Sequence, residues 1–76
     1  MTDKKFISEC KSQYAKLYNV DIDNIFVVWS CKTIQNFKCW IGSKSSDILM
    51  ECTYNGDKCE LYLDSYTKVR KDTISI

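Results

Sequence analysis

Five cysteines are the residues of this chain best suited to chemistry: Cys10, Cys31, Cys39, Cys52 and Cys59. Their number is odd, their spacing is irregular, and no C-x-x-C pair occurs. The chain also contains no His, which commonly activates a catalytic thiol and commonly joins Cys in zinc sites. We therefore expect no metal, no cofactor and no thiol catalysis. The thiols are predicted to be small core residues of a protein in a reducing compartment.

Other side chains offer weaker chemical signals. Asp21 and Asp23 have the D-x-D spacing of a calcium loop, but Phe26 stands where that loop needs Gly, and a lysine replaces its closing Glu. Ser8 and Lys11 have S-x-x-K spacing, on a stretch typical of a solvated helix face. With only two Gly, the chain cannot form a phosphate-cradling loop. These absences predict a protein that is not an enzyme.

Length and charge exclude further classes of protein. The chain has 76 residues, of which 45% are hydrophobic, so it is predicted to form one small domain spanning residues 1–76. A formal net charge of +1 argues against a histone-like role and against an acidic mimic of DNA. No apolar run approaches the roughly 20 residues of a membrane helix, and the first residues do not resemble a signal peptide. We expect a cytoplasmic protein without a membrane partner.

The apolar periodicity places these side chains on one helix and a sheet. Residues 4–19 are predicted to be a helix, because apolar residues from Phe6 to Tyr18 recur at spacings of three and four. Thr2 or Asp3 suits its start and Asn19 its end. Strands are predicted at 25–33, 38–42, 48–54 and 58–63, followed by a C-terminal segment, 64–76, with a short helix or turn at 65–70. The fold class is α+β: an N-terminal helix packed on a four-stranded antiparallel meander, or a five-stranded one if the tail adds a strand.

Asn55-Gly56 is the strongest local signal, because it suits a two-residue type I′ hairpin turn. This turn would place Cys52 opposite Cys59 in a hydrogen-bonded pair, where disulfide geometry is poor, so both are predicted to stay reduced. Aligning the strands then places all four strand cysteines beneath the helix. Trp29 shares that face with Cys31 in this register.

The opposite face of the predicted sheet carries a row formed by Lys32, Trp40, Leu49 and Tyr62. Lys38 falls opposite a glutamate, Glu51, as a cross-strand ion pair. An exposed row of this kind is typical of contact sites, with Trp and Tyr as the usual anchors. The candidate binding residues are therefore Trp40, Leu49, Tyr62, Lys32 and Lys38.

Several alternatives for this face stay open. It can be an ordinary sheet face, or the C-terminal segment can cover it through Tyr66, Val69 or Ile74. It can also stack single-stranded nucleic acid on its aromatic rings, with lysines near the phosphates. A homodimer through this face or through an edge strand is a further alternative, because a domain of this size is marginally stable alone.

Two stretches resemble an uncharacterised family of small proteins from phages and prophages of low-GC Gram-positive bacteria. They are residues 26–36, FVVWSCKTIQN, and residues 53–66, TYNGDKCELYLDSY, together with Lys5-Phe6-Ile7 near the start. The segments 20–24 and 44–49 depart from the family pattern. The resemblance implies a phage origin and a life in the host cytoplasm, and it assigns no catalytic residue. By analogy, we expect a protein that binds and inhibits a host protein, with an anti-defence role such as anti-CRISPR favoured.

Overall fold

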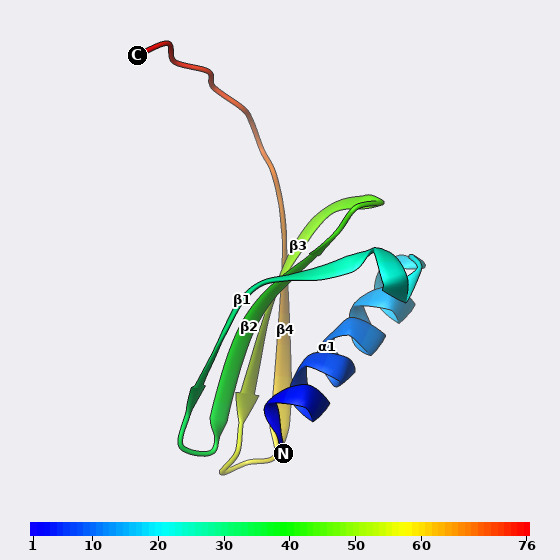
Figure 1. Ribbon diagram of the computed structural model, residues 1–76, viewed down its shortest axis with the longest axis vertical. Coiled ribbons are helices and arrows are strands. Elements are labelled where there is room, and N and C mark those ends of the chain that lie inside the picture. The colour runs from blue at the N-terminus through cyan, green and yellow to red at the C-terminus, as the bar shows by residue number, and fades with distance from the viewer.

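One helix lies across one face of a four-stranded sheet in the computed structural model, which describes residues 1–76 (Figure 1). The chain order is α1 (Asp3–Tyr18), a 3-10 turn η1 (Ile22–Asn24), β1 (Ile25–Thr33), β2 (Asn36–Ser43), β3 (Ser46–Asn55) and β4 (Glu60–Thr67). The strands form one antiparallel sheet in the order β1-β2-β3-β4. The α+β class and the four-stranded meander are confirmed. The alternative fifth strand is absent.

Both ends of α1 are set by the residues that the sequence indicated. The Thr2 side chain accepts a hydrogen bond from the Lys5 backbone N–H, at 3.2 Å, as an N-cap does. Asn19 closes the helix in the left-handed conformation, with φ 52° and ψ 51°. The helix therefore begins and ends one residue earlier than the sequence predicted.

The core lies between α1 and the sheet. Phe6, Cys10 and Tyr14 are buried on the inner side of the helix. The Tyr14 hydroxyl donates a hydrogen bond of 2.6 Å to the Ile48 carbonyl, which fixes α1 to β3. Leu17, expected on the buried side, is 58% exposed, so the apolar side of the helix is narrower than the periodicity predicted.

A β-bulge at Val28 changes which side chains of β1 face the helix. Val27 pairs with Ile41, whereas Trp29 pairs with Trp40, so Val28 is the extra residue between them. Because a bulge opposes two residues to one, it reverses the alternation of side chains beyond it. Trp29 and Cys31 consequently lie on the face away from α1. The prediction that they lie beneath the helix is wrong.

The β3–β4 turn is longer than the two residues predicted. Asn55 pairs with Glu60, so the turn comprises residues 56–59, and Cys52 pairs with Leu63 rather than with Cys59. The Asn55 side-chain oxygen accepts from the N–H groups of residues 57 and 58, and Cys59 takes the positive φ, 53°. Asn55 thus forms an Asx-type turn in place of a type I′ turn. The premise that Cys52 faces Cys59 is wrong, and all five cysteines are free.

The two hairpin turns at this end of the sheet are joined to each other. The Gly56 N–H donates to the Asn36 side-chain oxygen at 2.9 Å, and the Gln35 amide donates to the Asp57 carboxylate at 2.6 Å. A Cβ at Gly56 would lie 2.4 Å from the Gln35 carbonyl oxygen. Glycine is therefore needed here for close approach of two backbones and not for a positive φ.

The C-terminal segment leaves the sheet. β4 runs to Thr67, so the helix or turn predicted at 65–70 is absent and Tyr66 pairs with Leu49 as a strand residue. Beyond β4 the chain extends away from the body of the molecule (Figure 1), and Val69 is 97% exposed. The alternative in which Val69 or Ile74 covers the other face of the sheet is therefore wrong, whereas Tyr66 does lie against Trp40 on that face.

No helix has the length and apolar character needed to cross a membrane.

Candidate functional site

The face of the sheet turned away from α1, here called the outer face, carries six large apolar side chains. Five of them are between 39% and 49% exposed, and the sixth, Trp40, is half-buried. Strand pairing and alternation place them on four strands of one surface. We call this set the outer cluster: Phe26, Trp29, Trp40, Leu49, Tyr62 and Tyr66.

Ring packing and strand pairing bring members of the outer cluster together. The Trp40 and Tyr66 rings lie with their centroids 5.4 Å apart, and Tyr66 is the direct cross-strand partner of Leu49. Phe26 lies against Gly42 on the neighbouring strand, where an added Cβ would be 3.1 Å from the Phe26 ring. The absence of a side chain at Gly42 therefore leaves room for the Phe26 ring on the sheet.

A hollow of about 290 Å³ opens beside Trp29. Its lining comes mainly from β1 and β2: Trp29, Cys31, Thr33, Asn36, Phe37, Lys38 and Thr53. Sites for small molecules and cofactors usually range from about 300 to 1,000 Å³ and enclose most of the ligand. A hollow of this size on an open sheet face suits an anchoring side chain from a partner better than it suits a cofactor.

The charges on the outer face are mostly acidic. Lys38 Nζ lies 3.2 Å from Glu51 Oε2, which confirms the expected ion pair. The predicted position of Lys38 directly opposite Glu51 is wrong: they are diagonal neighbours, because Lys38 pairs with Thr53 and Glu51 with Trp40. Asp64 is the direct partner of Glu51 on β4 and has no ion pair of its own. The face therefore presents one neutralised lysine and an unpaired carboxylate.

Four of the five predicted binding residues lie on one face, but the single row predicted for them is wrong, because Leu49 pairs with Tyr66 and Tyr62 pairs with Thr53. Trp40, Leu49, Tyr62 and Lys38 all lie on the outer face. Lys32 lies on the helix side instead, with its Nζ 5.3 Å from the centroid of the Phe37 ring. The bulge at Val28 explains this, because it reverses the alternation before Lys32.

Trp29, Phe26 and Tyr66 belong to the outer face and were not predicted there. The run from residue 25 to residue 29 is apolar without alternation, so it contains no signal for the bulge that turns Trp29 outward. Tyr66 was considered only as part of a covering C-terminal segment, because β4 was expected to end at residue 63. The β3–β4 turn at residues 56–59 sets which residues of β4 pair with β3, so only a correct position for this turn could have placed Tyr66 on the outer face.

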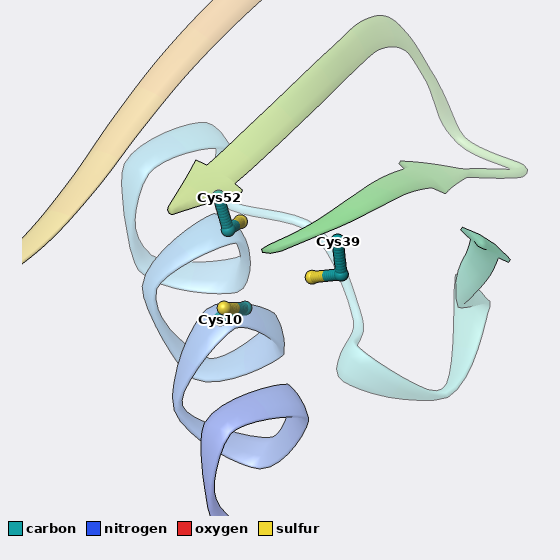
Figure 2. A group of neighbouring side chains, drawn as sticks. All are labelled: Cys10, Cys39 and Cys52. Carbon is teal, nitrogen blue, oxygen red and sulfur yellow. The ribbon is translucent and has the colours of Figure 1, made fainter. Parts of the chain in front are cut away.

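A second feature, which the spacing of cysteines did not predict, is a cluster of three buried thiols. The three side chains, Cys10 on α1, Cys39 on β2 and Cys52 on β3, lie next to one another between helix and sheet (Figure 2). Their sulfur atoms all lie within 4.8 Å of one another, and each residue is 0% exposed. Cys31 and Cys59 are exposed, so only two of the four strand cysteines lie beneath the helix. We call this set the sulfur cluster.

Interactions among the three thiols of the sulfur cluster shift their pKa values in different directions. Hydrogen bonds to Cys39 and Cys52, together with burial, raise the pKa of the Cys10 thiol. Hydrogen bonding to Cys10 lowers the pKa of Cys52, but hydrogen bonding to Cys39 and burial outweigh it and raise the pKa to about 12. Hydrogen bonds from Cys10 and Cys52 lower the pKa of Cys39, against the effect of burial. The pKa of each thiol therefore depends on its two neighbours in the sulfur cluster.

Comparison with known proteins assigns the chain to a family without assigning it an activity. A family model described as "Family of unknown function (DUF6275)" matches residues 2–76. The match extends through the C-terminal residues, beyond the part of the chain on which the sequence resemblance rested. No curated protein and no solved structure matches the chain.

Proposed function

The chain belongs to DUF6275, a family of unknown function, and we propose that it is a non-enzymatic protein-binding module whose contact surface is the outer face of its sheet. One observation carries the proposal: the outer cluster gathers aromatic side chains on a face that the chain itself does not cover. Clustered exposed apolar surface is typical of interaction sites, and Trp and Tyr are the residues that most often anchor protein interfaces.

The preferred partner is a protein surface with an apolar centre and a basic rim. The outer cluster supplies an apolar, aromatic centre, and the hollow beside Trp29 can receive one side chain from the partner. The Asp64 carboxylate at the edge has no ion pair within the chain, so it is free to meet a lysine or arginine.

The resemblance to phage and prophage proteins extends this proposal to a biological setting. A phage protein that binds through such a surface acts in the host cytoplasm by occupying a host protein and inhibiting it. An anti-defence role, for example as an anti-CRISPR protein, is the variant we favour. This part of the proposal depends on the resemblance and on analogy with other small phage proteins.

Binding of single-stranded nucleic acid through the same aromatic face is the second candidate function. The charges disfavour it, because phosphate binding needs free cations along the path of the strand. Lys38 is paired with Glu51, Lys32 lies on the other side of the sheet, and Asp64 adds an unpaired negative charge. The outer face therefore suits a protein better than a polyanion.

The test is a pull-down from host lysate with the tagged chain, with and without nuclease treatment. We expect one host protein to be retained after nuclease, to be lost with Trp29→Ala, and to be kept with Leu17→Ala. Leu17 is the matched control, because it is an exposed apolar residue on the helix layer. Recovery of nucleic acid alone, recovery of a second copy of this chain alone, or equal loss with both variants would overturn the proposal.

A further inference from the structure

We propose that Cys10, Cys39 and Cys52 form a three-coordinate, all-sulfur site for a thiophilic trivalent ion, with arsenic(III) as the ligand that fits. The inference concerns the inside of the molecule and is independent of the outer face. It rests on the geometry of the three sulfur atoms, on the absence of a fourth ligand and on the charge of the site.

The sulfur atoms are close to the positions that such an ion requires. They lie within 4.8 Å of one another, where α1 packs on β2 and β3 (Figure 2). With ion–sulfur bonds of about 2.3 Å, three sulfurs around a pyramidal centre are about 3.5 Å apart, so side-chain movements of roughly 1 Å suffice. Because the ligands come from α1, β2 and β3, a bound ion would tie the helix to the sheet.

The site offers three ligands and no fourth. The chain contains no His, and the group that could hold an ion contains only these three cysteines. All three residues are 0% exposed, which leaves no open position for water. Protein zinc sites are almost always four-coordinate, so the site disfavours zinc. It suits an ion that is complete with three sulfur ligands.

Charge selects among the ions that accept three thiolates. Three thiolates carry three negative charges, which a trivalent ion neutralises, whereas a divalent or monovalent ion leaves a buried net negative charge. An uncompensated buried charge is strongly unfavourable. No cationic side chain contributes to the pKa values of the three thiols, and the one charged side chain that does, Asp64, is negative. Neutrality therefore favours a thiophilic trivalent ion, and arsenic(III) is one that takes three sulfur ligands.

The binding reaction is balanced without an oxidant or a reductant. Arsenous acid, As(OH)₃, exchanges its three hydroxyl groups for three thiolates, so three As–S bonds form, three As–O bonds break and three waters leave. Each thiol proton leaves within one of these waters. Arsenic stays trivalent and the complex is neutral.

The test uses the full chain carrying Cys31→Ser and Cys59→Ser, which removes both exposed thiols. Reduced protein is incubated with sodium arsenite and examined by native mass spectrometry. We expect one adduct with the mass of one arsenic less three hydrogens, which identifies three As–S bonds. Cys10→Ala in the same background should lose this adduct, because two thiols leave a hydroxyl on the arsenic.

Thermal unfolding provides a second readout that does not depend on the Cys10→Ala variant folding. Arsenite at about 100 times its dissociation constant should raise the Tm of the protein with three cysteines by roughly 10 °C or more, provided that it binds the folded state alone. A missing adduct, an adduct that keeps a hydroxyl, or binding that appears only in denaturant with no rise in Tm would overturn the proposal. Stronger stabilisation by Zn(II) or Cu(I) than by arsenite would overturn the selection by charge.

Discussion

Ile34 occupies a backbone conformation that a β-branched side chain disfavours. It lies in the two-residue turn between β1 and β2, with φ 53°, and its side chain is 84% exposed, so burial does not compensate for the strain. We predict that Ile34→Gly stabilises the fold by about 1 kcal/mol, which corresponds to a rise in Tm of about 4–8 °C. Urea unfolding and a thermal scan would measure it. A loss of stability would contradict the prediction and show that the Ile34 side chain stabilises the fold although it is exposed.

Gly56 should tolerate substitution much less well than Gly42. A Cβ at Gly56 meets the Gln35 backbone oxygen at 2.4 Å, and the turn cannot yield without breaking the link between the two hairpins. We predict that Gly56→Ala lowers the free energy of unfolding by about 2–3 kcal/mol. Gly42→Ala is the control, because its Cβ meets only the far end of the Phe26 ring, at 3.1 Å. Equal losses in urea unfolding would contradict this distinction.

One buried tyrosine hydroxyl contributes to the attachment of the helix to the sheet. Tyr14 is 0% exposed and donates to the Ile48 carbonyl at 2.6 Å. We predict that Tyr14→Phe costs about 1 kcal/mol, the usual net value of such a hydrogen bond, because the Ile48 oxygen loses its buried donor. Tyr18→Phe is the matched control, since Tyr18 bonds Ser65 at an exposed site and its loss should cost less. The reverse order in chemical denaturation would contradict the prediction.

Elements whose signals are local in sequence could be predicted, and those that depend on distant contacts could not. The helix follows from its caps and periodicity, which are confined to residues 2–19. The bulge at Val28 arises from pairing with β2, and the Asn55-Gly56 turn depends on contacts with the other hairpin. The two errors affected the predicted site differently. The bulge places Trp29 on the outer face and Lys32 on the helix side. The longer turn changes the β4 register but not which face the β4 residues occupy.

The sulfur cluster could not be predicted from the sequence for the same reason. Metal and redox motifs are recognised by short spacings, whereas Cys10, Cys39 and Cys52 belong to three separate elements. Cys39 and Cys52 pair across two strands, and Cys10 joins them only after the helix packs on the sheet. A correct β2–β3 register could have indicated the pair, but not the third member.

On the scale of the whole molecule, the outer face depends on the C-terminal segment staying away from it. The chain beyond β4 has no regular structure, and its apolar residues Val69, Ile74 and Ile76 are at least 80% exposed. We predict that removal of residues 69–76 changes the free energy of unfolding by less than about 0.5 kcal/mol. A large loss in thermal or urea unfolding would indicate that the tail packs on the body and would remove the argument for an uncovered face.

The central claim is that the outer face is the contact surface, and the two tryptophans of the chain allow a direct test. Trp29 and Trp40 both lie on this face and are the only tryptophans in the sequence, so 5-fluorotryptophan labelling places both ¹⁹F reporters on the proposed site. A matched sample carrying 5-fluorotryptophan and Trp29→Phe assigns the two signals. Titration with the captured partner should shift or broaden both signals and saturate at one partner per chain. Saturating partner that leaves both signals unchanged would contradict the claim and place the contact elsewhere on the molecule.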